Sequence, residues 1–187
     1  MTTETPLEFE ARVRAWAAES LPQDDPDNPP HFEDDLEDWN RQRELQKLVW
    51  AGGFAGICFP TEYGGLGLST EYQEAYGRAT VGYQLPVRLN IPTFSIIAPV
   101  ILDFGTEEQK QKYVRGALKG EIVLSQFLSE PRGGSDLAGV ITRAERDGDT
   151  WVLNGNKICR PPPTARTTAS AWRARTGTRP STAACRC

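Results

Sequence analysis

The chain has 187 residues, of which 39% are apolar and 25% are charged, as in ordinary soluble globular proteins. No apolar run approaches the ~18 residues of a membrane span, and residues 1–20 lack the basic start and apolar core of a secretory signal, so we expect a cytoplasmic location and no membrane anchor. The four cysteines have neither disulfide-framework nor metal-ligand spacing, and His31 is the only histidine, so neither a metal site nor Ser-His chemistry is expected.

The net charge of −4 hides two regions of opposite sign. Residues 160–187 contain six arginines and no acidic residue, so residues 1–159 carry 15 basic and 25 acidic side chains. The body of the chain is therefore acidic and its tail is basic.

The first two predicted helices are separated by a linker. Residues 5–8 (TPLE) combine a capping box with proline in the first turn, so a helix is expected to begin there and to end before Pro22. The acidic, proline-rich stretch 24–30 is typical of a linker. A second amphipathic helix is expected from Asp34 or Asp35 to Ala51, where two glycines follow.

Three more helices are expected before residue 120. The glycine-rich stretch 60–67 requires irregular backbone, and Thr70-x-x-Gln73 offers a cap for a helix that ends near Tyr83. Residues 94–104 are almost entirely apolar and predict a buried helix in which Pro99 is a defect. Residues 106–109 (TEEQ) cap a last helix, which ends at Gly120.

The periodicity changes to that of β-strands after residue 120. Short strands are expected at 122–128 and 140–146, and the turn 147–149 leads into a third strand at 150–153. We therefore predict an α+β protein: an all-α helical domain at residues 1–120, followed by the beginning of an antiparallel β domain at residues 121–158. So few strands leave unpaired edges and an uncovered face.

The most informative stretch, LSEPRGGSDLAG at residues 128–139, lies between two of these strands. Gly133 and Gly134 allow the backbone to approach a ligand and turn its amides outward, and Ser135 adds a hydroxyl donor, which together suit phosphate oxygens. A Gly-Gly-Ser turn alone is more often a simple connection, so the neighbouring sequence decides.

This stretch resembles the signature of the acyl-CoA dehydrogenases, which pairs a hydroxyl residue and Glu with a small-residue turn that ends in Gly-Ser-Asp. Phe127 stands where the family usually has a small residue, and Arg132 stands where glycine is common. Three other family landmarks occur in order: FPTEYGGLG at 59–67, FGTEEQK at 104–110 and DGDTWVLNGNK at 147–157. The resemblance covers residues 7–158.

The resemblance implies a flavoenzyme that dehydrogenates an acyl-CoA thioester. In the family, a carboxylate removes the α-proton, the flavin accepts a hydride from the β-carbon, and a soluble electron-transfer flavoprotein removes the electrons. The residues expected to bind FAD are Gln126, Phe127, Leu128 and Ser129 at the isoalloxazine ring, with Gly134 and Ser135 near the pyrophosphate. Ser135 is also expected to lie near the acyl-CoA substrate, and family members are commonly homo-oligomers.

The catalytic base of the family is a glutamate in a carboxy-terminal helical domain, beyond residue 187. No residue of this chain is therefore expected to be catalytic, and Glu130 is expected to bond nearby backbone amides. We expect the chain alone to be inactive and to bind FAD weakly or not at all.

The resemblance ends after Ile158. Residues 159–187 are rich in Pro, Thr, Ala and Arg without apolar periodicity, which predicts a disordered tail. If the codons of residues 166–186 use GC-rich synonyms and are read from the third base, they can encode DYGICLARTDWDAPKHRGLS, which resembles the next family segment. We therefore hypothesise a frameshift near Ile158, in the gene or in its sequencing.

Two other functions remain open from the sequence. A non-catalytic helical module that associates with a full-length subunit would cover the unfinished sheet and the apolar helix faces. The six arginines of the tail could bind nucleic acid or an acidic surface, but the tail has only Trp172 as an aromatic and no known motif, so nucleic acid is not an expected partner.

Overall fold

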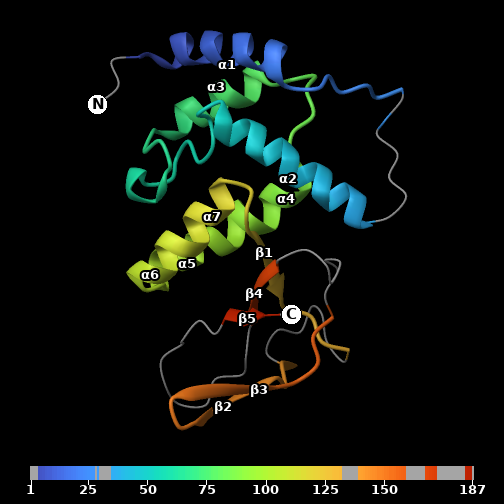
Figure 1. The fold of residues 1–187 in the computed structure, drawn as a ribbon, viewed down its shortest axis with the longest axis vertical. Helices are drawn as coiled ribbons and strands as arrows, with labels where there is room; N and C mark the ends of the chain where they lie inside the picture. Colours follow the sequence, from blue (N-terminus) through green and yellow to red (C-terminus); the bar gives the residue numbers. More distant parts are fainter. Residues whose placement is uncertain are drawn as a thin grey trace.

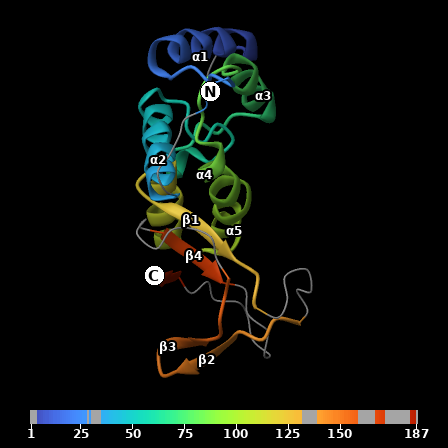
Figure 2. The ribbon, with the colours of Figure 1, turned by 90° about the vertical axis from the view of Figure 1, so that its right-hand side faces the viewer.

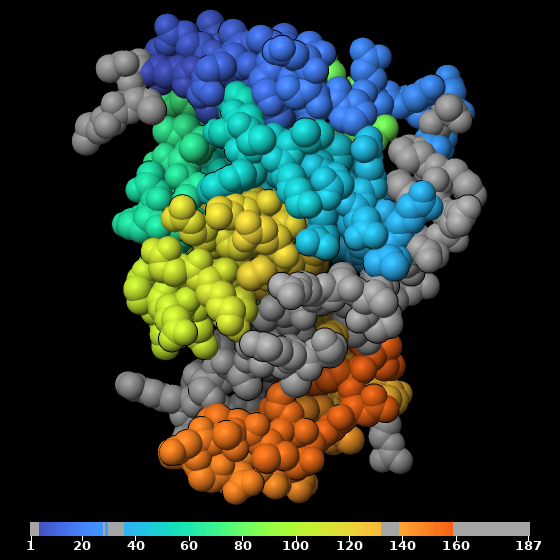
Figure 3. Space-filling model, viewed as in Figure 1, coloured from blue at the N-terminus to red at the C-terminus, as the bar shows by residue number. Residues whose placement is uncertain are grey.

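The helices occupy one end of the molecule and the strands the other, with helix α1 and the β2–β3 hairpin farthest apart (Figures 1 and 3). The computed structural model describes residues 4–27, 29, 35–131 and 139–158, and the backbone of 167–171 and 184–186. The helical elements are α1 (Pro6–Ser20), α2 (Asp35–Ala51), η1 (Thr61–Tyr63), α3 (Thr70–Ala79), α4 (Val87–Pro92), η2 (Thr93–Ile97), α5 (Ala98–Phe104), α6 (Glu107–Gln109), η3 (Lys110–Val114) and α7 (Arg115–Leu118). The strands are β1 (Val123–Phe127), β2 (Arg143–Asp147), β3 (Thr150–Asn154), β4 (Thr167–Ala171) and β5 (Ala184–Arg186).

Two capping boxes begin helices where the sequence predicted them. The Thr5 hydroxyl accepts a hydrogen bond from the Glu8 amide, and the Glu8 carboxylate accepts one from the Thr5 amide at 2.8 Å. Thr106 and Gln109 make the same reciprocal pair at the start of α6. Each box satisfies amides that the first turn of a helix leaves unpaired, so these helix starts are confirmed.

Helix α3 differs from its prediction at both ends. Thr70 is its first helical residue rather than its cap, and the helix ends at Ala79 rather than near Tyr83. The chain turns away because Gly82 has a left-handed backbone with φ +84°, and Tyr83 then forms a β-bridge with Gln23. The pairing with a distant segment overrides the local helical pattern.

The glycine-rich segment 60–67 folds back over Phe59. Gly64 and Gly67 have positive φ values of 91° and 63°, which other residues adopt with difficulty. A Cβ atom on Gly65 would lie 2.2 Å from the carbonyl oxygen of Phe59, so only glycine allows this approach. The irregular backbone predicted here is confirmed.

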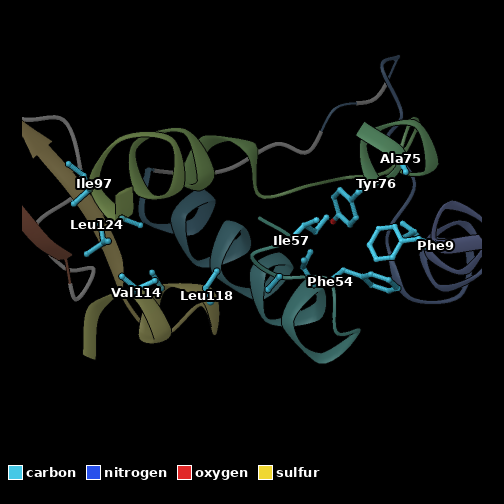
Figure 4. Close-up of a cluster of buried hydrophobic side chains, with 14 of the residues drawn as sticks. Phe9, Phe54, Ile57, Ala75, Tyr76, Ile97, Val114, Leu118 and Leu124 are labelled. Carbon is cyan, nitrogen blue, oxygen red and sulfur yellow. The ribbon is translucent and has the colours of Figure 1, made fainter. Parts of the chain in front are cut away.

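One hydrophobic core extends from the first helix to the first strand (Figure 4). At the α1 end, the rings of Phe9 and Phe54 meet edge to face with centroids 5.6 Å apart. At the other end, Leu124 of β1 is fully buried and shares the core with Val114 and Leu118. The first strand is therefore packed into the helical domain.

Residues 87–104 form one long helix with a π-helical segment, η2, in its middle. The sequence predicted a helix only from residue 94 and identified Pro99 as a defect. Pro92 and Pro99 flank η2, and each removes an amide donor and crowds the preceding turn, which the wider π turn accommodates.

By length and composition, this helix is the one among the described residues that could cross a membrane. Such a match is weak evidence, because core helices of globular domains pass the same test. Leu89, Thr93, Ile97, Ala98 and Ile101 are buried against the rest of the domain. The absence of a membrane partner stays a prediction.

The strands form two small sheets (Figure 2). β2 and β3 are an antiparallel hairpin around Gly148, which has a φ of +57°, as the sequence predicted. β1 pairs in parallel with β4, which pairs antiparallel with β5. The predicted fold class, a helical domain followed by a small antiparallel β region, is confirmed, with a parallel β1–β4 pair that was not expected.

β4 and β5 lie in the tail at residues 159–187, and the predicted disorder of that tail stays a prediction. β4 can pair with β1 because the edge of β1 has backbone groups that are free to bond an extended segment. The other residues of 159–187 lie outside the described residues, as does His31. The division at residues 120 and 158 into domains stays a prediction.

A buried hydroxyl ties β1 to the π-helical segment. Thr93 is fully buried, and its hydroxyl donates to the Leu124 carbonyl at 3.2 Å and accepts from the Leu124 amide at 3.3 Å. The single side chain thus satisfies both backbone groups of a residue in β1. The widened turn of η2 and the strand are held together at this point.

We predict that Thr93→Val lowers the free energy of unfolding by about 1–3 kcal/mol, because it leaves the Leu124 amide and carbonyl buried without a partner. Thr93→Ser keeps the hydroxyl and loses one methyl group, so it should cost only about 1 kcal/mol. Urea unfolding of the two variants beside the wild type measures both values. A Thr93→Val variant as stable as Thr93→Ser would show that the hydroxyl does not hold β1.

Candidate functional site

The candidate site lies where β1 leaves the helical domain. Gln126 and Phe127 end the strand, Leu128 and Ser129 follow it, and all four side chains are half-buried. Among the described residues, none is hydrogen-bonded to the side-chain amide of Gln126 or to the Ser129 hydroxyl. Two polar groups without a protein partner therefore lie beside two apolar side chains, and this set of groups would fit a planar ring with polar edges.

The next residue, Glu130, is buried, and hydrogen-bond donors from residues 141, 142 and 157 surround its carboxylate. Its Oε2 accepts from the Ile141 amide at 2.9 Å, and its Oε1 accepts from the Thr142 amide at 2.9 Å and the Thr142 hydroxyl at 2.5 Å. The Lys157 ammonium completes the set at 2.9 Å from Oε1. The predicted bonding of Glu130 to nearby backbone amides is confirmed.

These donors hold the pKa of Glu130 at about 2, well below its ordinary value of 4.5. The Thr142 hydroxyl is the largest cause, followed by the Ile141 amide and the Lys157 ammonium, each of which stabilises the ionised form. Burial acts in the opposite direction and is outweighed, because the surroundings of this carboxylate are polar. Glu130 is therefore an ionised structural group at neutral pH.

Lys157 and its neighbour also bind the backbone of the candidate site. The Lys157 ammonium donates to the Leu128 carbonyl at 3.0 Å, and the Ile158 amide donates to the Ser129 carbonyl at 2.9 Å. The side chain of Lys157 is only 10% exposed. The segment before Glu130 is thus tied to the residues that follow β3.

Gly155 leaves room for this arrangement. A Cβ atom at this position would lie 2.2 Å from the hydroxyl oxygen of Thr142, which is bonded to Glu130. Both Gly155 and Lys157 belong to the landmark at residues 147–157, although the sequence alone did not connect them with Glu130. The one feature of the sequence that could have indicated this contact is the positive charge of Lys157, two residues after the Asn-Gly turn.

Four of the predicted cofactor-binding residues come together at the end of β1. The other two, Gly134 and Ser135, lie outside the described residues. Arg132 lies there as well, while Phe127, the other departure from the family pattern, occupies the last position of β1. The roles of all six residues stay predictions.

Residues 3–121 match the family described as acyl-CoA dehydrogenase, N-terminal domain. The chain belongs to the acyl-CoA dehydrogenase family. The match covers well over half of the chain and includes the helical elements that carry β1. The three landmarks and the signature stretch agree with this membership.

Known acyl-CoA dehydrogenases are similar to this chain over most of its length. Acyl-CoA dehydrogenase IpdE1 from Mycobacterium tuberculosis is 33% identical over 159 residues, which cover 81% of this chain and 40% of that protein. The structure of glutaryl-CoA dehydrogenase from Mycobacterium smegmatis aligns with a TM-score of 0.65 at 27% identity, over 92% of this chain and 43% of that one. A structure described as electron transferring flavoprotein of Acidaminococcus fermentans aligns with a TM-score of 0.57 at 30% identity, over 84% and 40%.

The chain spans about 40% of the length of the IpdE1 relative that it matches. Its similarity therefore concerns the amino-terminal part of an acyl-CoA dehydrogenase. The oxidoreductase activity belongs to the family as a whole.

We predict that Glu130 makes the stability of the chain fall in acid. Because its folded pKa of about 2 lies below its ordinary value of 4.5, its contribution is complete above pH 4.5 and is lost as the pH falls toward 2. Unfolding free energies of the wild type and Glu130→Gln should therefore differ most near pH 6 and converge as the pH approaches 2. Parallel pH dependences of the two proteins would contradict the assigned pKa. Lys157 is the one charged side chain in contact with Glu130 among the described residues.

Proposed function

We propose that this chain is the amino-terminal part of an FAD-dependent acyl-CoA dehydrogenase, in which residues 126–129 lie against the isoalloxazine ring. The observation that carries the proposal is the pair of unpartnered polar groups, the Gln126 amide and the Ser129 hydroxyl, beside two apolar side chains at the end of β1. Family membership and the signature stretch support the same cofactor.

The residues of this chain would bind and orient the cofactor rather than perform the chemistry. Bound FAD would supply the hydride acceptor for α,β-dehydrogenation of an acyl-CoA thioester. Gln126 and Ser129 would bond the polar edge of the ring, while Phe127 and Leu128 would exclude water from it. Ser135 would contact the acyl-CoA substrate, as the resemblance implies.

The proton abstraction would need a carboxylate from elsewhere. Glu130 is unsuitable, because both of its oxygens already accept hydrogen bonds and its pKa of about 2 makes it a weak base. The family resemblance places the base in the carboxy-terminal helical domain. We therefore propose that these 187 residues alone are inactive and bind FAD weakly.

We also propose that a frameshift near Ile158 replaced the following family sequence. The support is the peptide DYGICLARTDWDAPKHRGLS, which GC-rich codons of residues 166–186 can encode from their third bases. Under this hypothesis the six arginines of the tail are incidental, and a nucleic-acid partner is not expected. A gene sequence that cannot encode this peptide in a neighbouring frame would eliminate the hypothesis.

The proposed partners belong to the full-length form. They are the acyl-CoA substrate, an electron-transfer flavoprotein and further copies of the same subunit. The similarity to a chain described as electron transferring flavoprotein supports a flavin-based electron partner. The cytoplasmic location stays a prediction.

The alternative is a non-catalytic helical module that associates with a full-length subunit. Val87 and Ile91 favour it, because these two apolar side chains are more than half exposed and lie one turn apart on α4. Co-purification of the short chain with a complete subunit, without flavin of its own, would support this alternative.

The proposed function is tested by comparing the 187-residue chain with a version whose reading frame is restored after Ile158. Flavin content and acyl-CoA-dependent dye reduction should be absent in the short chain and present in the restored one, which should be yellow and bleach with an acyl-CoA. If the short chain itself holds FAD and turns over, the catalytic base lies within these residues, and its placement in a carboxy-terminal domain is wrong. A colourless restored protein would contradict the FAD assignment.

A further inference from the structure

Three segments of the chain meet at the ion pair of Glu130 and Lys157. The first segment is Leu128–Glu130, the second is Ile141–Thr142 and the third is Lys157–Ile158. Glu130 binds the second segment through two amides and a hydroxyl, and Lys157 binds the first through a carbonyl and the carboxylate. The three segments are thereby fixed relative to one another.

The contacts divide the polar groups of the candidate site into two sets. The carbonyls of Leu128 and Ser129 are both occupied by donors from residues 157 and 158. The Ser129 hydroxyl and the Gln126 amide have no partner among the described residues. One set holds the backbone in place, and the other is left for the ligand.

Burying the two charges of Glu130 and Lys157 costs desolvation free energy, which argues that the pair does more than stabilise the fold. The side chains of Glu130 and Lys157 are 3% and 10% exposed, so both charges have largely left water. A buried ion pair is often no more stabilising than apolar residues of the same size, because desolvation offsets the attraction. A well-bonded pair of this kind does specify one backbone arrangement.

We propose that Glu130, Thr142 and Lys157 are positioning residues for the cofactor, which hold the backbone of Leu128 and Ser129 so that the Ser129 hydroxyl faces the flavin. This inference rests on the proposed function. It assigns roles to three residues that need not touch FAD. Thr142 acts through Glu130, and Lys157 acts on the segment directly.

The test uses the restored-frame protein and its dissociation constant for FAD, measured by the change in flavin fluorescence. Thr142→Val removes the hydroxyl and keeps the shape of the side chain, while Thr142→Ser keeps the hydroxyl. We expect Thr142→Val and Lys157→Met to weaken FAD binding by about tenfold or more, and Thr142→Ser by no more than about twofold. The absorption bands of the bound flavin should shift in the first two variants only.

Val13→Ala is the control for a general loss of stability. Val13 is fully buried in α1, at the opposite end of the molecule from the β2–β3 hairpin (Figure 1). This variant should be less stable and still bind FAD with the affinity and spectrum of the wild type. Weakened binding in Val13→Ala equal to that in Thr142→Val would overturn the positioning role.

A second readout needs no cofactor. In the 187-residue chain, Lys157→Met should accelerate hydrogen exchange at the Ile141 and Thr142 amides, which donate to Glu130, and leave the amides of α1 unchanged. If the restored wild type binds no FAD, the proposed function fails. If it binds FAD and the Thr142 and Lys157 variants bind it equally well, only the positioning inference is overturned.

Discussion

The Glu130 carboxylate is the constraint on which the arrangement of the β region depends. A buried carboxylate must be surrounded by donors, and here they come from segments on either side of the hairpin formed by β2 and β3. Satisfying Glu130 therefore fixes where the hairpin begins, through Thr142, and where the chain leaves it, through Lys157. The same contacts set the backbone of the residues that follow β1.

The helical domain holds the other end of the candidate site. Leu124 is packed in the core and bonded by Thr93, so β1 enters the site from a fixed position. Between Leu124 and Glu130, the residues from Gln126 to Ser129 are half-buried and keep polar groups available. A short segment held at both ends suits the orientation of a rigid ligand.

Local features of this fold could be predicted from the sequence, while features that depend on distant partners could not. The capping boxes at Thr5 and Thr106 involve residues three positions apart, so their spacing identifies them. The bonding of Thr93 to Leu124 and the end of α3, where Tyr83 pairs with Gln23, depend on segments far apart in the sequence. The amide bonds of Glu130 were expected, but the contribution of Lys157 was not, because a single sequence does not reveal which lysine reaches a given carboxylate.

The most direct test of the central claim is a crystal structure of the restored-frame protein with FAD. We predict that the Ser129 hydroxyl lies within hydrogen-bond distance of the flavin ring, with Glu130 and Lys157 paired as they are here. A flavin bound elsewhere, with residues 126–129 facing solvent, would contradict the account.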